Sequence, residues 1–184
     1  MWARWRWRGL TKRLATIQLV LLDVDGVLTD GSLFYGPEGE LSKCFNVRDG
    51  LGIRLLQNAG IEVAFLSGGR GGATEVRAQH LGIRHCLVGA MDKPHALTEL
   101  CQRVGVGPEQ IVYVGDDLND LALRGRVGLL IAPADAVPAL RRRADAVLIR
   151  KGGHGAVREL AERLLKSRGE WEQLCRQGWR DRND

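Results

Sequence analysis

The chain has 184 residues, enough for one domain with a sizeable hydrophobic core. Residues 1–14 carry five basic and no acidic side chains, which accounts for the whole formal net charge of +5 and leaves residues 15–184 neutral. A neutral body argues against a nucleic-acid-binding protein, because affinity for the phosphate backbone requires an excess of basic side chains. The basic segment also holds Trp2, Trp5 and Trp7, which leaves open a weak contact of this tail with a membrane surface or nucleic acid.

No apolar run approaches the roughly 18 residues of a membrane span, and the basic start lacks the apolar core of a signal peptide. The four cysteines form no CxxC pair and have no histidine at a metal-ligand interval, which is typical of reduced thiols in the cytosol. They are Cys44, Cys86, Cys101 and Cys175. We therefore expect a cytoplasmic protein without stable membrane association.

Short apolar runs alternate with amphipathic stretches, the pattern of a parallel sheet flanked by helices. In chain order the expected elements are strand 17–22, hairpin 32–45, helix 48–59, strand 61–66, helix 72–80, strand 85–88, helix 93–104, strand 111–114, short helix 117–123, strand 127–131, helical turns 137–143, strand 146–149 and a last helix 156–166. The expected fold is one doubly wound, Rossmann-like α/β domain over residues 15–166. We expect a disordered basic tail at 1–14 and a polar tail without fixed structure at 167–184.

Two carboxylates follow the first expected strand directly. The two-residue spacing of Asp23 and Asp25 places both side chains on one side of the chain as the strand ends. Gly26 then lets the backbone turn away. In open α/β sheets, ligands bind beyond the carboxyl ends of the strands, so this pair lies where a reaction would occur.

Other strand ends carry polar groups as well. Residues 67–72 offer a serine hydroxyl and glycine-exposed amides at the start of a helix, which is a natural anion site. Residues 116–120 contain three aspartates, a composition that suits a hard cation such as Mg²⁺. Lys93 begins another helix and is interpreted either as a solvated side chain or as a contact to phosphate.

The ordered set of a carboxylate pair, a hydroxyl with amides, a lysine and a carboxylate cluster resembles the haloacid dehalogenase superfamily of phosphoryl-transfer enzymes. The resemblance spans residues 17–165. It implies that Asp23 is the nucleophile, Asp25 the general acid and base, Ser67 and Lys93 the binders of phosphoryl oxygens, and Asp23, the Asp25 carbonyl and Asp116 the Mg²⁺ ligands. Asp117 and Asp120 would then orient the metal-bound waters and Lys93.

A carboxyl group two positions past the nucleophile favours a phosphatase, because it can protonate the leaving alkoxide and later deprotonate the attacking water. Only 42 positions separate Asp25 from Ser67, and 26 separate Ser67 from Lys93, so neither interval can hold the cap domain common in the superfamily. The expected hairpin, with apolar Leu33, Phe34 and Tyr35, is a candidate lid or assembly element.

Longer motifs look like the 3-deoxy-D-manno-octulosonate 8-phosphate phosphatase family. They are Leu22–Gly31, Phe45–Gly50, Gly52–Arg54, Val114–Leu118 and Gly152–Glu159. This resemblance implies a capless, Mg²⁺-dependent homotetramer of lipopolysaccharide precursor synthesis, in which the hairpins build a barrel and a neighbouring subunit helps to close the site. The substrate contacts it implies are Asp25, Asn46, Val47, Arg48, Asp49, Gly50, Arg54, Gly68, Arg70, Arg77, Lys93 and His154, with the arginines facing a carboxylate or phosphate.

Two departures from that family leave the sugar open. The family commonly has Thr-Gly-Arg where this chain has Ser67-Gly68-Gly69, and whether Arg70 replaces the missing arginine is undetermined. His154 stands where an arginine is frequent. A nonulosonate 9-phosphate of sialic-acid type is therefore the alternative substrate. A catalytically idle scaffold that recruits a partner through its tail or hairpin is the alternative from a different class, and the Asp23→Asn variant discriminates it from an enzyme.

Overall fold

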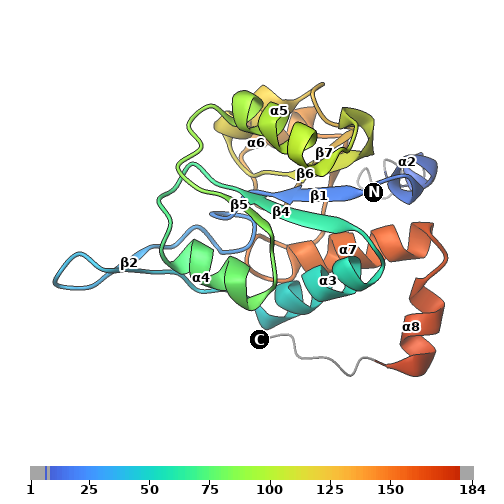
Figure 1. Ribbon diagram of the computed structural model, residues 1–184, viewed down its shortest axis with the longest axis horizontal. Helices are drawn as coiled ribbons and strands as arrows, with labels where there is room; N and C mark the ends of the chain where they lie inside the picture. The colour runs from blue at the N-terminus through green and yellow to red at the C-terminus, as the bar shows by residue number, and fades with distance from the viewer. Residues whose placement is uncertain (1–6, 8, 179–184) are drawn as a thin grey trace.

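The structure, a computed structural model, describes residue 7 and residues 9–178 of the chain. At its centre is a six-stranded parallel sheet of order β5-β4-β1-β6-β7-β8 with helices on both faces (Figure 1). Its strands are β1 Leu19–Leu22, β4 Glu62–Leu66, β5 His85–Leu87, β6 Ile111–Val114, β7 Leu129–Ala132 and β8 Ala146–Val147. The doubly wound α/β fold expected from the sequence is confirmed.

The helices are α2 Thr11–Ala15, α3 Val47–Asn58, α4 Ala73–His80, α5 Lys93–Val104, α6 Pro138–Arg143, α7 Ala156–Ser167 and α8 Trp171–Gln177. Two short 3₁₀ helices, η1 Pro108–Gln110 and η2 Leu118–Leu123, flank β6. The short helix expected at 117–123 is therefore of the 3₁₀ type. Its Asp117 and Asp120 side chains accept backbone hydrogen bonds there and fix a tight turn.

Every residue of β1 is buried, because helices cover the sheet on both sides. Val20 and Leu22 pack with residues of α2, α3, α4 and α7, whereas Leu19 and Leu21 pack with residues of α5, α6 and η2. The apolar run of β1 thus divides its side chains between two hydrophobic cores. This rigid central strand ends at the two carboxylates of the candidate site.

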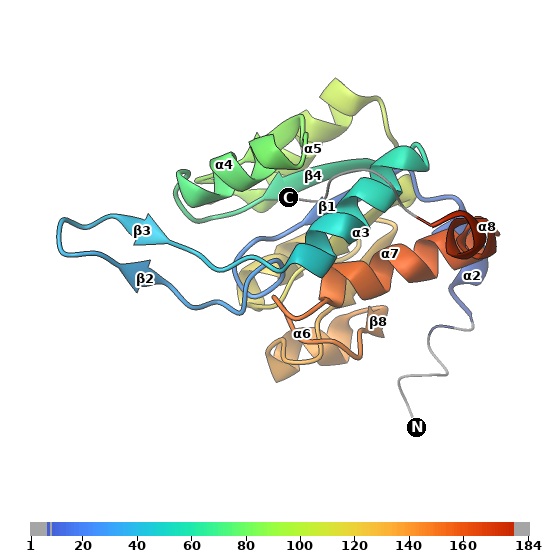
Figure 2. The same cartoon turned by 90° about the horizontal axis from the view of Figure 1, so that it is seen from below.

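The segment between β1 and α3 forms the expected hairpin, made of β2 Phe34–Tyr35 and β3 Leu41–Ser42 in antiparallel pairing. It projects beyond the carboxyl ends of the strands (Figure 2). Leu33, Phe34 and Tyr35 are exposed on it. No inserted domain lies between β1 and β4 or between β4 and α5, all of which are described, so the capless architecture is present.

The N-terminal segment differs from the expected disordered tail where it is described. Leu10 and Leu14, spaced four residues apart, are buried, and α2 packs on α7. Trp7 is also buried; its Nε1 donates to the carbonyl of Val147 at 3.1 Å, and the Arg163 guanidinium lies 4.1 Å from its ring centre. Apolar burial therefore extends the packed body to Trp7. The expectations for Trp2, Trp5 and the rest of residues 1–6 lie outside the described residues.

The C-terminal segment also differs from the expectation, because α8 follows α7 and α7 is not the last helix. The Trp171 ring lies 5.5 Å from the Arg158 guanidinium and 5.2 Å from the Lys166 ammonium, which holds α8 against α7. Trp179 lies outside the described residues. Within the described part of the chain, every helix is too short or too polar to cross a membrane.

We expect truncation of Leu14 to destabilise the whole domain. Leu14→Ala removes a buried side chain between α2 and α7 and should lower the free energy of unfolding by about 3 kcal/mol. Lys12→Ala, on the exposed side of the same helix, should change it by less than about 0.5 kcal/mol. Urea unfolding followed by circular dichroism checks both. Coincident midpoints for the two variants would show that α2 does not support the domain.

Candidate active site

The carboxyl ends of β1, β4 and β6 surround one cavity of about 530 Å³. Its lining brings together most of the residues expected to carry the chemistry. They are Asp23, Asp25, Gly26, Gly31, Ser67, Gly68, Gly69, Asp116, Asp117, Leu118 and Asn119. Parallel strands whose ends meet at one edge of the sheet explain why motifs far apart in the sequence share this cavity.

A buried ammonium stands behind the cavity. Lys93, the first residue of α5, is 3% exposed, and its Nζ donates to Asp23 Oδ2 at 2.8 Å, Asp120 Oδ1 at 2.5 Å and the Tyr113 hydroxyl at 2.9 Å. Burial lowers the pKa of Lys93, but the two carboxylates outweigh it and raise that pKa above its ordinary value. Lys93 therefore stays charged beside the carboxylate of Asp23. Sequence patterns alone did not single out Tyr113, because it looks like an ordinary residue of a buried strand.

Asp120 uses both carboxylate oxygens to hold its neighbours. Oδ1 accepts hydrogen bonds from Lys93 and from the Tyr113 hydroxyl. Oδ2 accepts from the backbone N–H of Asp116 at 2.7 Å and of Asp117 at 3.1 Å. With these partners, Asp120 fits the role of orienting Lys93 and the Asp116 loop.

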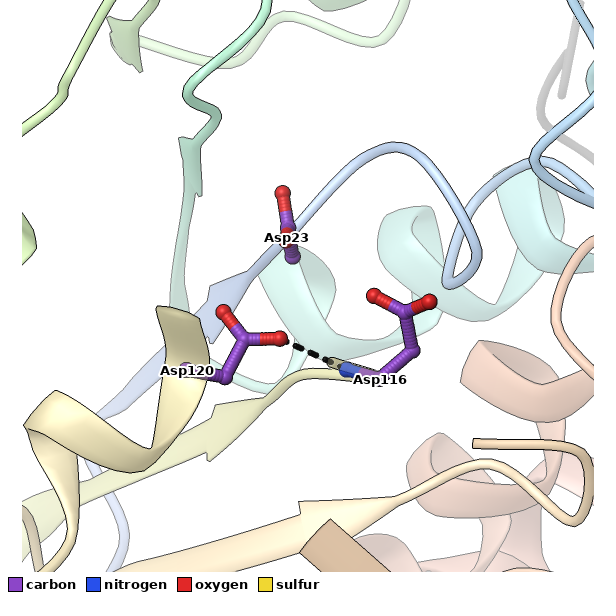
Figure 3. Close-up of side chains that lie close together, drawn as sticks. All are labelled: Asp23, Asp116 and Asp120. Carbon is purple, nitrogen blue, oxygen red and sulfur yellow. Dashed lines mark hydrogen bonds between the residues drawn. The ribbon is translucent and has the colours of Figure 1, made fainter. Parts of the chain in front are cut away.

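Three carboxylates crowd together at this edge. Asp23, Asp116 and Asp120 each offer an oxygen within 4.8 Å of the others, and Figure 3 shows the three side chains together, with Asp23 directly after β1. Burial and repulsion from Asp120 raise the pKa of Asp23 to about 6; burial and repulsion from Asp120 and Asp23 raise that of Asp116 to about 7. Carboxylates that are this costly to ionise together form a good site for a hard divalent cation.

Gly26 makes room for this cluster. Its φ is +77°, and a Cβ built there would lie 2.0 Å from Asp116 Oδ2, so only glycine fits between the β1 loop and the Asp116 carboxylate. The chain thus keeps the Asp116 carboxylate against the backbone that follows Asp25. The clustered carboxylate oxygens of Asp23, Asp116 and Asp120 fit a hard cation such as Mg²⁺.

The β4 end supplies the expected hydroxyl and glycines. Ser67 is buried and lines the cavity, and its Oγ accepts a hydrogen bond from the Gly69 N–H at 3.1 Å. Gly69 lies close to the acid–base candidate, because a Cβ built there would be 3.1 Å from Asp25 Oδ2. Arg70 is exposed and does not line the cavity. Arg70 therefore does not take the place of an arginine at position 69.

Lys43, which sequence reasoning missed, contacts Asp25. Its ammonium lies 2.8 Å from both carboxylate oxygens, donating to Oδ2, while Oδ1 lies outside hydrogen-bonding geometry. It also donates to Thr74 Oγ1 at 3.3 Å. The Lys43 side chain is 2% exposed. The only signal in the sequence is a lysine on the outgoing arm of the expected hairpin, a position that reads as a solvated charge.

Several residues expected to contact substrate support the local fold. Asp49 is buried, and its carboxylate accepts from the N–H groups of Gly155 and Arg158 at 3.1 and 2.8 Å, which caps the start of α7. Asn46 caps α3 by accepting from the Arg48 N–H at 2.8 Å, and its Nδ2 donates to the Gly153 carbonyl. Gly50, inside α3, is buried, whereas Val47 is exposed.

The arginines and His154 lie outside the cavity. Arg54 donates to the carbonyl of His80, the last residue of α4. Arg77 lies 5.8 Å from the ring centre of Phe45 at the base of the hairpin. Arg48 and His154 line a second cavity of about 700 Å³ beside α7. One chain therefore gathers most of the expected catalytic groups in one cavity but leaves the expected arginine and histidine contacts outside it.

Comparison with known proteins identifies the family. A haloacid dehalogenase-like hydrolase model matches residues 47–126. The chain is 45% identical over 157 residues to the 3-deoxy-D-manno-octulosonate 8-phosphate phosphatase of Escherichia coli K12, covering 85% of this chain and 84% of that protein. This chain belongs to that phosphatase family.

Solved structures of the phosphatase family share the fold. The Yersinia pestis enzyme superposes with a TM-score of 0.87 at 45% identity, covering 89% of this chain and 88% of that chain. The Moraxella catarrhalis enzyme, solved with magnesium, phosphate and 3-deoxy-D-manno-octulosonate (KDO), gives a TM-score of 0.89 at 34% identity, covering 92% and 98%. The resemblance inferred from the motifs is thereby confirmed.

We expect Gly26→Ala to weaken Mg²⁺ binding at least tenfold, because the new methyl group displaces the Asp116 carboxylate. Gly39→Ala, at the hairpin tip, is the matched control: its φ is +87°, but a Cβ built there meets nothing within 4 Å. Isothermal titration of each variant with Mg²⁺ measures the dissociation constants. An unchanged constant in Gly26→Ala would place the cation elsewhere.

The raised pKa values of Asp23 and Asp116 set the sign of the pH dependence of metal-free protein. Their usual pKa of 3.8 rises on folding to about 6 and about 7, so the folded state binds more protons and stability falls as pH rises through this range. A bound cation relieves the repulsion between the ionised carboxylates. Saturating Mg²⁺ should therefore raise the melting temperature more at pH 8 than at pH 5, measured by scanning calorimetry. Asp116→Asn should abolish most of that difference, and equal rises at both pH values in the unsubstituted protein would contradict the assignment.

Proposed function

We propose that this chain is a Mg²⁺-dependent phosphomonoesterase that hydrolyses 3-deoxy-D-manno-octulosonate 8-phosphate to the free sugar acid and phosphate. The observation that carries the proposal is the buried Lys93 ammonium on the carboxylate of Asp23, at the edge of a cavity that Asp25 and Ser67 also line. Membership of the family supports the substrate, since the M. catarrhalis relative holds magnesium, phosphate and KDO.

In the proposed first step, Asp23 attacks phosphorus and the bond from phosphorus to the sugar oxygen breaks. Asp25 donates its proton to the leaving alkoxide, and an aspartyl-phosphate remains on Asp23. Water then attacks the phosphorus while Asp25 takes the proton of that water, which releases phosphate and restores Asp23. Lys93, with the Ser67 hydroxyl, stabilises the charge on the equatorial phosphoryl oxygens.

The proposed Mg²⁺ ligands are the side chains of Asp23 and Asp116 and the carbonyl oxygen of Asp25. When bound, the cation supplies positive charge that reduces the repulsion between the nucleophile and a phosphate dianion. Asp120 and Asp117 hold the loop that carries Asp116, since Asp120 accepts from two of its backbone N–H groups. Asp23 thus has a positive neighbour on its Lys93 side already in the metal-free chain.

We further propose a cytoplasmic homotetramer that binds neither nucleic acid nor, stably, a membrane. The exposed apolar hairpin supports assembly, since Leu33, Phe34 and Tyr35 have no cover in one chain. The position of Arg48 and Arg77 outside the catalytic cavity supports a sugar-acid site completed by a neighbouring subunit. The reaction would supply the sugar acid for lipopolysaccharide precursor synthesis.

Gly69 favours one second candidate, a phosphatase for a nonulosonate 9-phosphate or another small sugar phosphate. No side chain extends from position 69, where the family commonly has an arginine, and a Cβ there would lie 3.1 Å from Asp25 Oδ2. Arg70 is exposed and outside the cavity. The loss of this arginine favours a change of sugar rather than of chemistry, because Lys93 still contacts both Asp23 and Asp120.

The test is phosphate release with Mg²⁺ across octulosonate 8-phosphate, a nonulosonate 9-phosphate and simple sugar phosphates. We expect the highest kcat/KM for the octulosonate ester and a loss of at least 1,000-fold in turnover for Asp23→Asn, which lacks the nucleophile. A preference for the nine-carbon ester would replace the substrate and keep the mechanism. Turnover at background on every ester would leave the inactive scaffold as the better description.

A further inference from the structure

Lys43 is a buried lysine that the mechanism above does not use. It directly follows β3, and its side chain is 2% exposed although the hairpin itself extends into solvent. Lysine is rarely this buried without a partner. Its partner is Asp25, whose side chain is 34% exposed and lines the catalytic cavity. The ammonium thus contacts both oxygens of the proposed acid–base carboxylate, and Lys43 is not among the residues that line the cavity.

The contacts of Lys43 join three separate parts of the fold. The hairpin supplies the lysine, the loop after β1 supplies Asp25, and α4 supplies Thr74, whose hydroxyl accepts from Nζ at 3.3 Å. Thr74 is fully buried. The β4 loop lies close by, since a Cβ built on Gly69 would be 3.6 Å from Lys43 Nζ and 3.1 Å from Asp25 Oδ2. A side chain held on these sides has little freedom to rotate.

We propose that Lys43 is a positioning residue that fixes the Asp25 carboxylate toward the oxygen of the leaving group. Proton transfer requires Asp25 within hydrogen-bond reach of that oxygen, and a shift of about 1 Å can cost about 100-fold in rate. Lys93 holds the carboxylate of Asp23 in the same way, by donating a hydrogen bond to it. Each of the two reacting carboxylates therefore has a separate buried lysine. This inference rests on the proposed phosphatase function.

The hairpin thereby becomes part of the catalytic apparatus of its own chain. Lys43 is the residue next to Ser42, the end of β3, so a change in how the hairpin is seated moves the anchor of Asp25. The expected role of the hairpin as a lid or assembly element concerns its exposed tip. Lys43 instead lies at the base of the hairpin, and it contacts Asp25 within the same chain.

The dependence of kcat/KM on the leaving group of the ester distinguishes a loss of Asp25 positioning from general damage to the fold. An alkyl phosphate needs a proton on its departing oxygen, whereas 4-nitrophenolate leaves without one. Lys43→Met should lower kcat/KM about 100-fold for octulosonate 8-phosphate, or for whichever alkyl phosphate the unsubstituted protein hydrolyses best. For 4-nitrophenyl phosphate, it should lower kcat/KM by less than about threefold. Lys43→Arg, which keeps a charged donor, should recover part of the loss.

A double substitution provides the control. If Lys43 acts through Asp25, Lys43→Met should cause no further loss of kcat/KM for the alkyl ester in the Asp25→Asn background. Equal losses on both esters, or additive losses in the double variant, would overturn the proposal. Circular dichroism and Mg²⁺ titration of each variant check the fold and the metal site. Absence of alkyl phosphatase activity in the unsubstituted protein, by contrast, would count against the proposed function.

Discussion

The structure depends on one buried cation among anions, the ammonium of Lys93. It joins Asp23 at the end of β1, Tyr113 on β6 and Asp120 on η2 through hydrogen bonds of 2.5 to 2.9 Å. Without it, buried carboxylates would face one another in a poorly solvated pocket, which is a large cost. The contact that offsets this cost also holds Asp23, the proposed nucleophile, in place. The same contacts of the Lys93 ammonium therefore bear on the stability of the fold and on the proposed reaction.

Asp25 presents a second, weaker version of the same arrangement. Its carboxylate is partly open to the cavity, and the lysine that contacts it comes from the hairpin rather than from the sheet-covering helices. The proposed nucleophile is thus contacted by a lysine of a sheet-covering helix, while the proposed acid–base group is contacted by a lysine at the base of the hairpin. This difference suits the proposed roles, because the acid–base group would serve two successive steps with different partners.

Local patterns in the sequence were enough to predict the sheet, its helices and the strand ends that carry the chemistry. Asp23, Ser67, Lys93 and Asp116 could be predicted because each follows or begins an element with a clear period. Lys43 and Tyr113 could not, since their partners are 18 and 20 residues away and depend on tertiary packing. The packing of Trp7 on Val147, 140 residues away, escaped for the same reason.

Motif resemblance located candidate positions without showing whether each contacts substrate or supports the local fold. Asp49 and Asn46 belong to the motif around α3, yet their oxygens accept backbone hydrogen bonds that begin α7 and α3. Such residues fix the starts of the two helices and the glycine-rich segment between β8 and α7. A sequence motif alone cannot distinguish a side chain that contacts a ligand from one that holds the neighbouring loop.

The glycine at position 69 bears on how sequence change can act at this site. A Cβ there would lie 3.1 Å from Asp25 Oδ2, so a larger residue at this position would press on the proposed acid–base group. Asp23 and Lys93 hold each other through a contact that does not involve position 69. Substitution in this turn therefore alters the surroundings of Asp25 while the lysine–carboxylate cluster stays intact.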